Sequence, residues 1–396
     1  MSRVFCMVMG IALSACGAAE TGVGTTLELR SLVVSPATAS IVAGQLQQFS
    51  VSGAWSDGRD SVPSASFAAT GGTISSAGLY TAGATTGSYR VIVTHIGGTL
   101  ADTAFVTVTA PNPQAVVLVQ EGFEDNAAAG RGWYDNVAWT TTTAEKIAGS
   151  TKSLEFRWDV GAALPTFGGT ARHLFAPTRS LYVSYWVKYS ANWSGSGVSY
   201  QPHEFQILTT DSDQWLGPSF TNLTTYIEHR YLVNGGVPVV GMTDGANIVI
   251  GQVGQNLTAV TETRSVAGCN GNSDGRATDC YALGGGLFNN GKWLMPPNNE
   301  AVFSPTAGPR YKNDWHRIEV FVRLNTVQSG VGQLDGVAQY WFDGQLILNE
   351  QNLLFRTGAK PTMQWNQFII GPYIGPGSPV AQSMWIDDLL IATSKP

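Results

Sequence analysis

Polar side chains of catalytic types alternate with apolar ones in two short stretches, residues 203–208 and 224–231. The apolar positions are Phe205, Ile207 and Ile227. A β-strand points successive side chains to opposite faces, so one face of each stretch is expected in the core and the other forms a polar row. This row, the candidate site, contains Glu204, Gln206, Tyr226, Glu228 and Arg230.

If this row acts on a glycan, one of two reactions open to it is β-elimination from a uronic acid polymer. That reaction needs a group to neutralise the sugar carboxylate, a base for the C5 proton and an acid for the leaving oxygen. Alternation turns His203 and His229 away from Gln206 and Tyr226, so the two sets share a face only if a β-bulge intervenes. A structural role is the alternative for either histidine. The residues of suitable type are His203, Gln206, Tyr226, His229, Arg230 and Lys312.

Hydrolysis of a glycosidic bond is the second reaction to consider. It requires two carboxyl groups that flank the bond, and Glu204 and Glu228 are the pair that neighbouring strands could bring together. Sugar binding also uses aromatic faces against the apolar side of the ring. Trp193 and Trp215 lie in polar surroundings and are the candidates to line a groove, although most aromatic residues of the chain belong in its core.

Composition places the chain among all-β exported proteins. Its 396 residues include 46 Gly, 13% charged residues and 10% aromatic residues, a profile unlike that of helical or disordered chains. The net charge is -6 and no long run of one sign occurs. A nucleic-acid partner normally requires a basic patch, so this class of partner is not expected.

The first residues have the pattern of an export signal, with Arg3 followed by an apolar segment that is too short to remain as a membrane span. The sequence Leu-Ser-Ala-Cys that ends at Cys16 resembles a bacterial lipobox, which implies a lipid anchor on Cys16 and a location at the cell envelope. In an exported protein, Cys269 and Cys280 are then expected to form one local disulfide.

The chain divides into five predicted segments: a signal peptide (1–15), a tether (16–26), a small β-sandwich (27–110), a linker (111–116) and a large β-domain (117–396). Short strands separated by Gly-rich turns fill the small sandwich. Its stretches GGTISSAGLYTAG and TAFVTVTA resemble bacterial Ig-like domains, which implies a spacer.

Several stretches of the large domain resemble concanavalin-like lectin and glucanase sandwiches: EGFEDN, YVSYWVKYS, DWHRIEVFVRLN, YWFDGQLI and WIDDLLIAT. The resemblance implies a jelly roll of two sheets that forms a groove for a polysaccharide, and Asp343-Gly344 is expected at a tight hairpin turn. Laminarinase-like members carry an E-x-D-x-x-E pattern that is missing here, which disfavours hydrolysis. Alginate lyases of this shape carry Q-I-H, where this chain has Leu208 after Gln206-Ile207.

Acidic residues at the two ends of the large domain form a candidate structural calcium site, because the resemblance implies that the terminal strands pair and hard oxygen ligands suit calcium. Turn-capping is the alternative role for these carboxylates. The candidate ligands are Glu121, Glu124, Asp125, Asp387 and Asp388. Taken together, the sequence predicts an all-β surface lipoprotein that binds a polysaccharide and cleaves it as a lyase. The alternatives are a non-catalytic glycan-binding or adhesive protein and a structural surface module.

Overall fold

The computed structural model describes residues 27–58, 60–110, 114–166, 170–198, 202–210, 213–218, 221–232, 234–243, 282–283, 286–287, 293–358 and 360–396. Strands are the main regular structure of these residues, which confirms the predicted all-β class. The helical elements among them are short 3-10 turns, η1 (Ala128–Arg131) and η6 (Pro297–Asn299). No helix in the described ranges is both long and apolar enough to cross a membrane.

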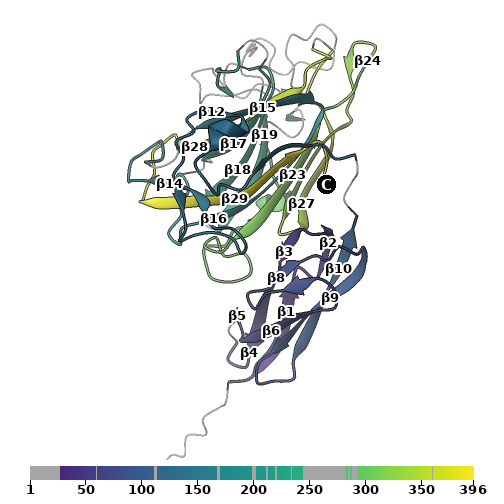
Figure 1. Ribbon diagram of the computed structural model, residues 1–396, viewed down its shortest axis with the longest axis vertical. Helices are drawn as coiled ribbons and strands as arrows, with labels where there is room; N and C mark the ends of the chain where they lie inside the picture. The colour runs from purple at the N-terminus through teal and green to yellow at the C-terminus, as the bar shows by residue number, and fades with distance from the viewer. Residues whose placement is uncertain are drawn as a thin grey trace, which may run out of the picture.

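Two units with separate cores make up the described chain (Figure 1). The smaller unit contains three small sheets, ordered β1-β4-β5, β2-β10-β9-β6 and β3-β8-β7. Its core is built from the inward positions of these strands, such as Val34, Val91 and Val106. The Ig-like assignment of this unit stays a prediction. Its strands are β1 (Leu29–Ser35), β2 (Thr38–Val42), β3 (Leu46–Gln48), β4 (Ser50–Trp55), β5 (Asp60–Ser61), β6 (Ala65–Ala69), β7 (Thr73–Ile74), β8 (Leu79–Thr81), β9 (Gly87–His95) and β10 (Ala101–Thr109).

The larger unit is a jelly-roll-like sandwich of two large sheets. One sheet has the order β13-β14-β29-β16-β23-β26-β27, with β11 also paired to β29. Its strands are β11 (Val117–Glu121), β13 (Thr141–Thr142), β14 (Ser153–Trp158), β16 (Ser180–Tyr189), β23 (His316–Arg323), β26 (Gly336–Phe342), β27 (Gln345–Leu353) and β29 (Gln382–Ala392). We call it the eight-stranded sheet.

The second sheet of the larger unit, the seven-stranded sheet, has the order β12-β15-β28-β17-β18-β19-β22. Its strands are β12 (Trp133–Asp135), β15 (Ala171–Thr178), β28 (Trp365–Tyr373), β17 (His203–Leu208), β18 (Thr224–Leu232), β19 (Gly235–Thr243) and β22 (Trp293–Leu294). Two small hairpins lie outside both sheets, formed by β20 (Ala282–Leu283) with β21 (Gly286–Leu287) and by β24 (Val327–Gln328) with β25 (Val331–Gly332).

The hairpin between β26 and β27 turns where the sequence predicts it. Phe342 pairs with Gln345, and the two residues between them, Asp343 and Gly344, have φ values of 48° and 78°. Positive φ at both central positions is the backbone that an Asp-Gly hairpin turn requires. The Asp343 carboxylate accepts hydrogen bonds from the Arg317 amide and from His316 Nδ1, both at 2.8 Å. The turn is therefore tied to β23.

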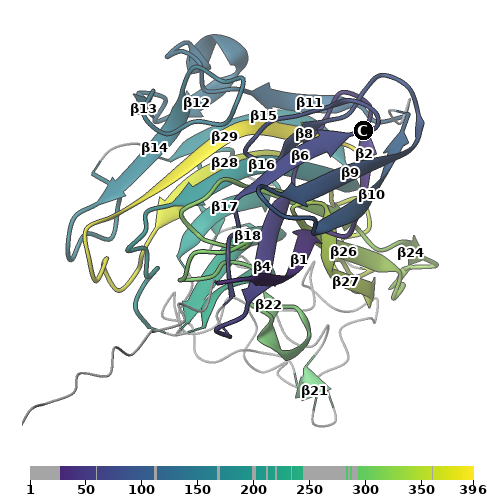
Figure 2. The same ribbon diagram turned by 90° about the horizontal axis from the view of Figure 1, so that it is seen from below.

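The smaller unit lies against the outer side of the eight-stranded sheet (Figures 1 and 2). The Arg317 guanidinium donates to the Leu46 carbonyl at 3.1 Å and to Gln45 Oε1 at 3.3 Å. The Gln47 amide donates to the Asp343 carbonyl. Buried side-chain hydrogen bonds of this kind fix the two units relative to each other.

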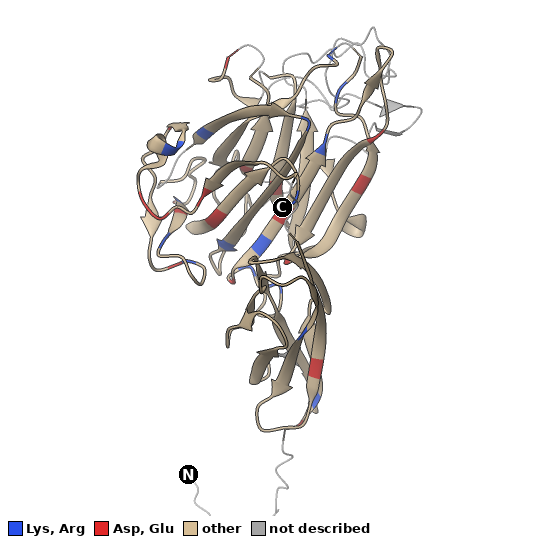
Figure 3. Ribbon diagram, turned by 45° about the vertical axis from the view of Figure 1, so that its right-hand side comes forward, with Lys and Arg blue, Asp and Glu red and all other residues tan. Residues whose placement is uncertain are grey.

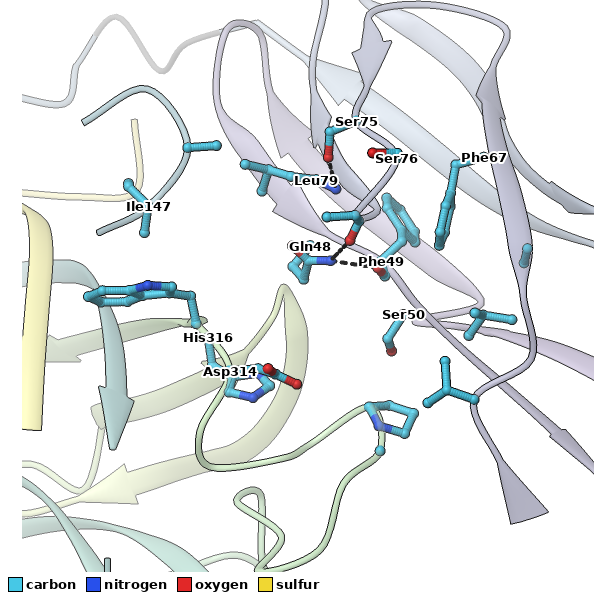
Figure 4. Close-up of a pocket in the computed structure, with 18 of the residues that line it drawn as sticks. Gln48, Phe49, Ser50, Phe67, Ser75, Ser76, Leu79, Ile147, Asp314 and His316 are labelled. Atoms are coloured by element: carbon cyan, nitrogen blue, oxygen red, sulfur yellow. Dashed lines mark hydrogen bonds between the residues drawn. The ribbon is translucent and has the colours of Figure 1, made fainter. Parts of the chain in front are cut away.

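A cavity of about 470 Å³ opens between the two units. Figure 4 shows Gln48, Ser50 and Phe67 of the smaller unit on one side, facing Ile147 and Asp314 of the larger unit. Trp186 and His316 of the eight-stranded sheet also line this cavity, and it is separate from the polar row that the sequence singles out. Charged residues are sparse over both units in Figure 3 and do not gather into a surface of one sign in that view.

Candidate functional site

The two faces of the seven-stranded sheet carry different rows of side chains. One row faces the eight-stranded sheet and is apolar from β15 to β22: Ala171, Ile370, Phe205, Ile227, Val240 and Leu294. The neighbouring row lies on the other face, which we call the outer face. It crosses all seven strands in direct register: Tyr134, Arg172, Ile369, Gln206, Tyr226, Gly241 and Trp293. The predicted division between an apolar and a polar face therefore holds for Phe205 and Ile227 on one side and for Gln206 and Tyr226 on the other.

An irregularity at the start of β17 changes which residues share the outer face. His203 pairs with Tyr373 and Phe205 pairs with Ile370, so β17 advances two residues while β28 advances three. Such a bulge re-aims the side chains beside it. The His203 ring stacks on Tyr226, with centroids 5.3 Å apart, and on Tyr373 at 5.9 Å. His203 therefore lies on the outer face with Tyr226.

His203 and Glu228 form a close pair on this face. His203 Nδ1 lies 2.5 Å from Glu228 Oε1, and the Glu228 side chain is fully buried while that of His203 is 22% exposed. An ionised carboxylate only accepts hydrogen bonds, so the proton of this bond belongs to Nδ1. In a neutral imidazole the other nitrogen, Nε2, is then the proton acceptor. Glu228 thus orients His203 as a base.

Gln206 and Arg230 are further polar groups of the outer face. Gln206 lies directly opposite Tyr226, and Gly371 leaves room for its amide, because a Cβ at Gly371 would come within 2.8 Å of Gln206 Oε1. The Arg230 Nε atom is buried and has no hydrogen-bond partner in the part of the chain that the structure describes. A buried guanidinium donor without a partner is suited to an anionic ligand.

Glu204 lies on the opposite face, so the prediction that it shares a face with Gln206, Tyr226 and Arg230 is wrong. Glu204 Oε2 is 2.8 Å from His229 Nδ1, and Glu204 Oε1 accepts a 2.8 Å hydrogen bond from the Tyr189 hydroxyl of the eight-stranded sheet. His229 Nε2 in turn lies 2.7 Å from the Tyr340 hydroxyl. The bulge at β17 is the cause, since it moves His203 outward and Glu204 inward. This buried network joins the two sheets.

The predicted sugar-binding residues lie in different places. Trp215 is 55% exposed and packs edge-on against Tyr134, at the β12 end of the outer-face row. Trp193 is in the core against Trp158 and Tyr189, which corrects its predicted place in the groove. The Gly and Ser residues next to Trp193 form a loop. Their polar character led to the prediction that the indole is exposed, whereas the indole packs into the core.

Lys312 also lies away from the outer-face row. Its ammonium group donates a 2.5 Å hydrogen bond to the Trp193 carbonyl, and burial lowers its pKa. It lines a separate cavity of about 370 Å³ together with Trp193 and Tyr231. The predicted role of Lys312 in the same groove as Gln206 and Tyr226 therefore does not fit its position.

Four of the five predicted calcium ligands, Glu121, Glu124, Asp125 and Asp387, accept hydrogen bonds from protein groups in the structure. Arg131 binds Glu121 through two hydrogen bonds of 2.8 and 2.9 Å and binds Asp125 at 2.7 Å. Glu124 accepts from the Thr151 and Lys152 amides. Within the described ranges, no three His, Cys, Asp or Glu side chains gather as a metal site would require. Calcium binding stays a prediction.

The last two carboxylates of that set lie in β29. Asp387 accepts hydrogen bonds from the Ile147 amide and the Ser150 hydroxyl, both at 3.2 Å. Burial raises the pKa values of both Asp387 and Asp388. Cys16, Cys269 and Cys280 lie outside the described residues, so the lipid anchor and the disulfide also stay predictions.

Sequence reasoning missed several outer-face residues on β12, β15 and β28. Tyr134, Arg172, Gln367 and Tyr373 belong to strands distant in sequence from the first two stretches. One local signal in the sequence points to these residues: every second position of β28 shares a face, which groups Gln367, Ile369, Gly371 and Tyr373. This pattern does not say which strands pair with β28. These residues reach the site only because their strands pair within the seven-stranded sheet, and the sequence alone does not reveal that pairing.

No protein-family model matches this chain, and no curated protein matches it in sequence. Among solved structures, the alginate lyase vAL-1 from Chlorella virus aligns over 70% of this chain and 100% of its own, with 12% identity and a TM-score of 0.44. The endo-β-1,4-glucuronan lyase of the fungus Trichoderma reesei aligns over 65% of this chain and 87% of its own, with 13% identity and a TM-score of 0.35.

An endo-1,3-β-glucanase from Streptomyces sioyaensis aligns over 73% of this chain and 99% of its own, with 13% identity and a TM-score of 0.38. The similar structures thus include polysaccharide lyases and a glucanase with a jelly-roll fold. The roles of individual residues in this chain rest on its own geometry.

Proposed function

We propose that this chain is a carbohydrate-active protein whose outer face binds an acidic polysaccharide and cleaves it by β-elimination. The observation that carries the proposal is the gathering of His203, Gln206, Tyr226, Glu228 and Arg230 on one face of β17 and β18. An orienting carboxylate, a base, a hydroxyl and a guanidinium donor are the groups that this reaction requires.

Each group has a role in the proposed reaction. Arg230 and Gln206 bind the uronate carboxylate and stabilise the negative charge that develops on it. His203 Nε2 removes the C5 proton, while Glu228 stabilises the imidazolium that forms. The C4–O bond breaks as the C4–C5 double bond forms, and the Tyr226 hydroxyl gives its proton to the leaving oxygen. Tyr226 then regains a proton from solvent, and His203 releases one.

Hydrolysis by Glu204 and Glu228 is the weaker alternative because the two carboxyl groups lie on opposite faces of the sheet. Glu204 bonds to Tyr189 and His229 between the sheets, whereas Glu228 bonds to His203 on the outer face. Glycosidases place both carboxyl groups on either side of one bond. This pair does not meet that requirement.

A non-catalytic glycan-binding protein is the second candidate. It is favoured by the burial of the central groups, since Gln206 is 4% exposed and Tyr226 is 3% exposed. The more accessible groups of the outer face are His203, Tyr373 and Trp215. A surface that only binds sugars needs these accessible rings and does not need contact with the Tyr226 hydroxyl.

Incubation of the full chain with alginate, polyglucuronate and polygalacturonate separates the two candidates. A lyase produces an unsaturated uronate, which is detected by its ultraviolet absorbance. Tyr226→Phe is expected to abolish this signal while retention on a gel of the same polymer is kept, because only the hydroxyl is removed. Retention of the wild-type chain with no unsaturated product from any polymer would establish the binder instead.

We also propose that the chain is exported and held at the cell envelope by a lipid on Cys16. The sequence pattern that ends at Cys16 supports this proposal, and the residues that the structure describes do not bear on it. Cys16→Ser is expected to abolish incorporation of labelled fatty acid and to release the chain from the membrane fraction. Equal incorporation in the variant would disprove the anchor.

A further inference from the structure

A short loop at the edge of the seven-stranded sheet presents an exposed indole. In residues 213–218 the Trp215 amide donates to Asp213 Oδ1 at 2.9 Å, and the Leu216 amide donates to the Asp213 carbonyl at 3.2 Å. The Trp215 side chain remains 55% exposed. An Asx-type turn therefore fixes the backbone that carries a largely exposed aromatic ring.

The same loop is tied to the outer face through one carbonyl group. The Gln214 carbonyl accepts hydrogen bonds from Gln367 Nε2 at 2.8 Å, from the Tyr134 hydroxyl at 3.2 Å and from Arg172 Nη1 at 3.4 Å. The donors come from β28, β12 and β15 respectively. Three donors saturate an oxygen that has two lone pairs.

Arg172 extends this attachment to the next residue of the loop. Its Nη1 donates to the Leu216 carbonyl at 2.9 Å, and its Nε is held by Asp135 Oδ2 at 2.8 Å. Arg172 is largely buried, so its guanidinium group holds the loop in place and is not presented to solvent. The carbonyls on both sides of Trp215 are therefore held by the sheet.

The Trp215 ring lies at one end of the outer-face row. Its centroid is 5.0 Å from that of Tyr134 in an edge-to-face arrangement. Tyr134 on β12 is four strands from Tyr226 on β18, which corresponds to roughly 19 Å at the usual spacing between strands. A polysaccharide that crosses the strands would reach Trp215 several sugar units away from the reacting bond.

We propose that Trp215 is a stacking platform for a distal sugar ring of the polysaccharide, and that Arg172 and Gln367 are positioning residues that hold it in place. This inference rests on the proposed function of the outer face. An exposed ring whose backbone is already fixed loses little conformational entropy when a ligand covers it. The apolar face of a sugar ring is the ligand surface that fits an indole.

The test compares a long polymer with a trisaccharide of the same uronate. Trp215→Ala is expected to weaken retention on alginate, polyglucuronate or polygalacturonate gels by on the order of tenfold and to raise KM for the polymer, with kcat unchanged. Turnover of the trisaccharide is expected to be unchanged, because it does not extend to Trp215. Trp215→Phe should recover most of the retention.

Arg172→Lys and Gln367→Leu are expected to raise KM for the polymer in the same length-dependent way, although Trp215 itself is intact. Phe105→Ala removes a ring that is 56% exposed on the smaller unit and serves as the matched control, with no expected change. If a polymer gel retains the wild-type chain and the Trp215→Ala variant equally strongly, this inference is overturned while the proposed function stands. Failure of the wild-type chain to bind any of the polymers would overturn the proposed function as well.

Discussion

His203 Nδ1 lies 2.5 Å from Glu228 Oε1 on the outer face of the seven-stranded sheet. The residues next to them in sequence, Glu204 and His229, form a second pair at 2.8 Å on the opposite face. The same two strands thus carry two His-Glu pairs back to back. Only the first has an exposed edge, and the second joins the two sheets, so we expect different consequences when each is changed.

Glu228→Gln is expected to lower turnover of a uronate polymer by about 10² to 10⁴-fold, the usual contribution of general acid-base catalysis. The amide keeps the shape of the side chain but no longer fixes the proton on His203 Nδ1 or stabilises the imidazolium. The measurement is the initial rate of formation of unsaturated product. Wild-type rates in this variant, with an unchanged fold, would remove His203 and Glu228 from the mechanism.

Glu204→Leu is expected to destabilise the chain by about 1 to 3 kcal/mol, because it removes the carboxylate that both His229 Nδ1 and the Tyr189 hydroxyl contact and leaves these two buried groups, 2.9 Å apart, with only each other on that side. Urea denaturation measures the change. The double variant Glu204→Leu with His229→Leu should be less destabilised than the sum of the two single variants. Additive effects would mean that the two side chains do not interact.

The bulge at β17 explains where the sequence was a reliable guide to the site and where it was not. Strict alternation correctly separates Phe205 and Ile207 from Gln206, because the strand is regular there. The alternation rule fails at Glu204, one residue earlier. There β28 has one residue more than β17, and this register shift exchanges the faces of His203 and Glu204. A register shift depends on the partner strand, and no local pattern in residues 203–208 encodes it.

The hairpin at Asp343-Gly344 was predictable because both strands and the turn are contiguous in sequence. The Trp215 loop was only partly predictable, since the indole was recognised while its supports were not. Arg172 and Gln367 are 42 and 153 residues away from the atoms of Gln214 that they bind. Pairings of that range are determined by the packing of the whole sheet and not by local composition.

Glu319 makes stability depend on pH at the junction of the two units. Burial alone would raise the pKa of this carboxyl group, but Arg317 and Lys395 outweigh burial and lower the pKa to about 2. A carboxyl group with a lowered pKa in the folded state stabilises the fold above its unfolded pKa, and this contribution is lost as pH falls toward 2. The full contribution is roughly 3 kcal/mol.

Glu319→Gln is therefore expected to be less stable than the wild type at pH 7, and the difference should shrink as pH falls from 5 toward 2. Urea midpoints across this range provide the measurement. Glu350→Gln, at a partly exposed position of β27, is the control. A difference between Glu319→Gln and the wild type that stays constant with pH would contradict the assigned ion pairing.

Gln47 and Gln48 are neighbours on β3 whose amides stabilise different parts of the molecule. The Gln47 amide donates across the junction to the Asp343 carbonyl, whereas the Gln48 amide donates to the Phe49 and Ala77 carbonyls inside the smaller unit. Gln47→Ala leaves a buried acceptor without its donor, at a cost of about 1 to 3 kcal/mol. This cost falls on the contact between the units.

We therefore expect Gln47→Ala to broaden the distribution of distances in small-angle X-ray scattering and to speed proteolytic cleavage within residues 111–116, the predicted linker. Gln48→Ala is the matched control and should leave both readouts unchanged, because its hydrogen bonds lie within one unit. If the two variants scatter identically, the smaller unit is held by the Arg317 contacts without a contribution from Gln47. Arg317→Met would then be the variant that separates the units, since Arg317 contacts both Leu46 and Gln45.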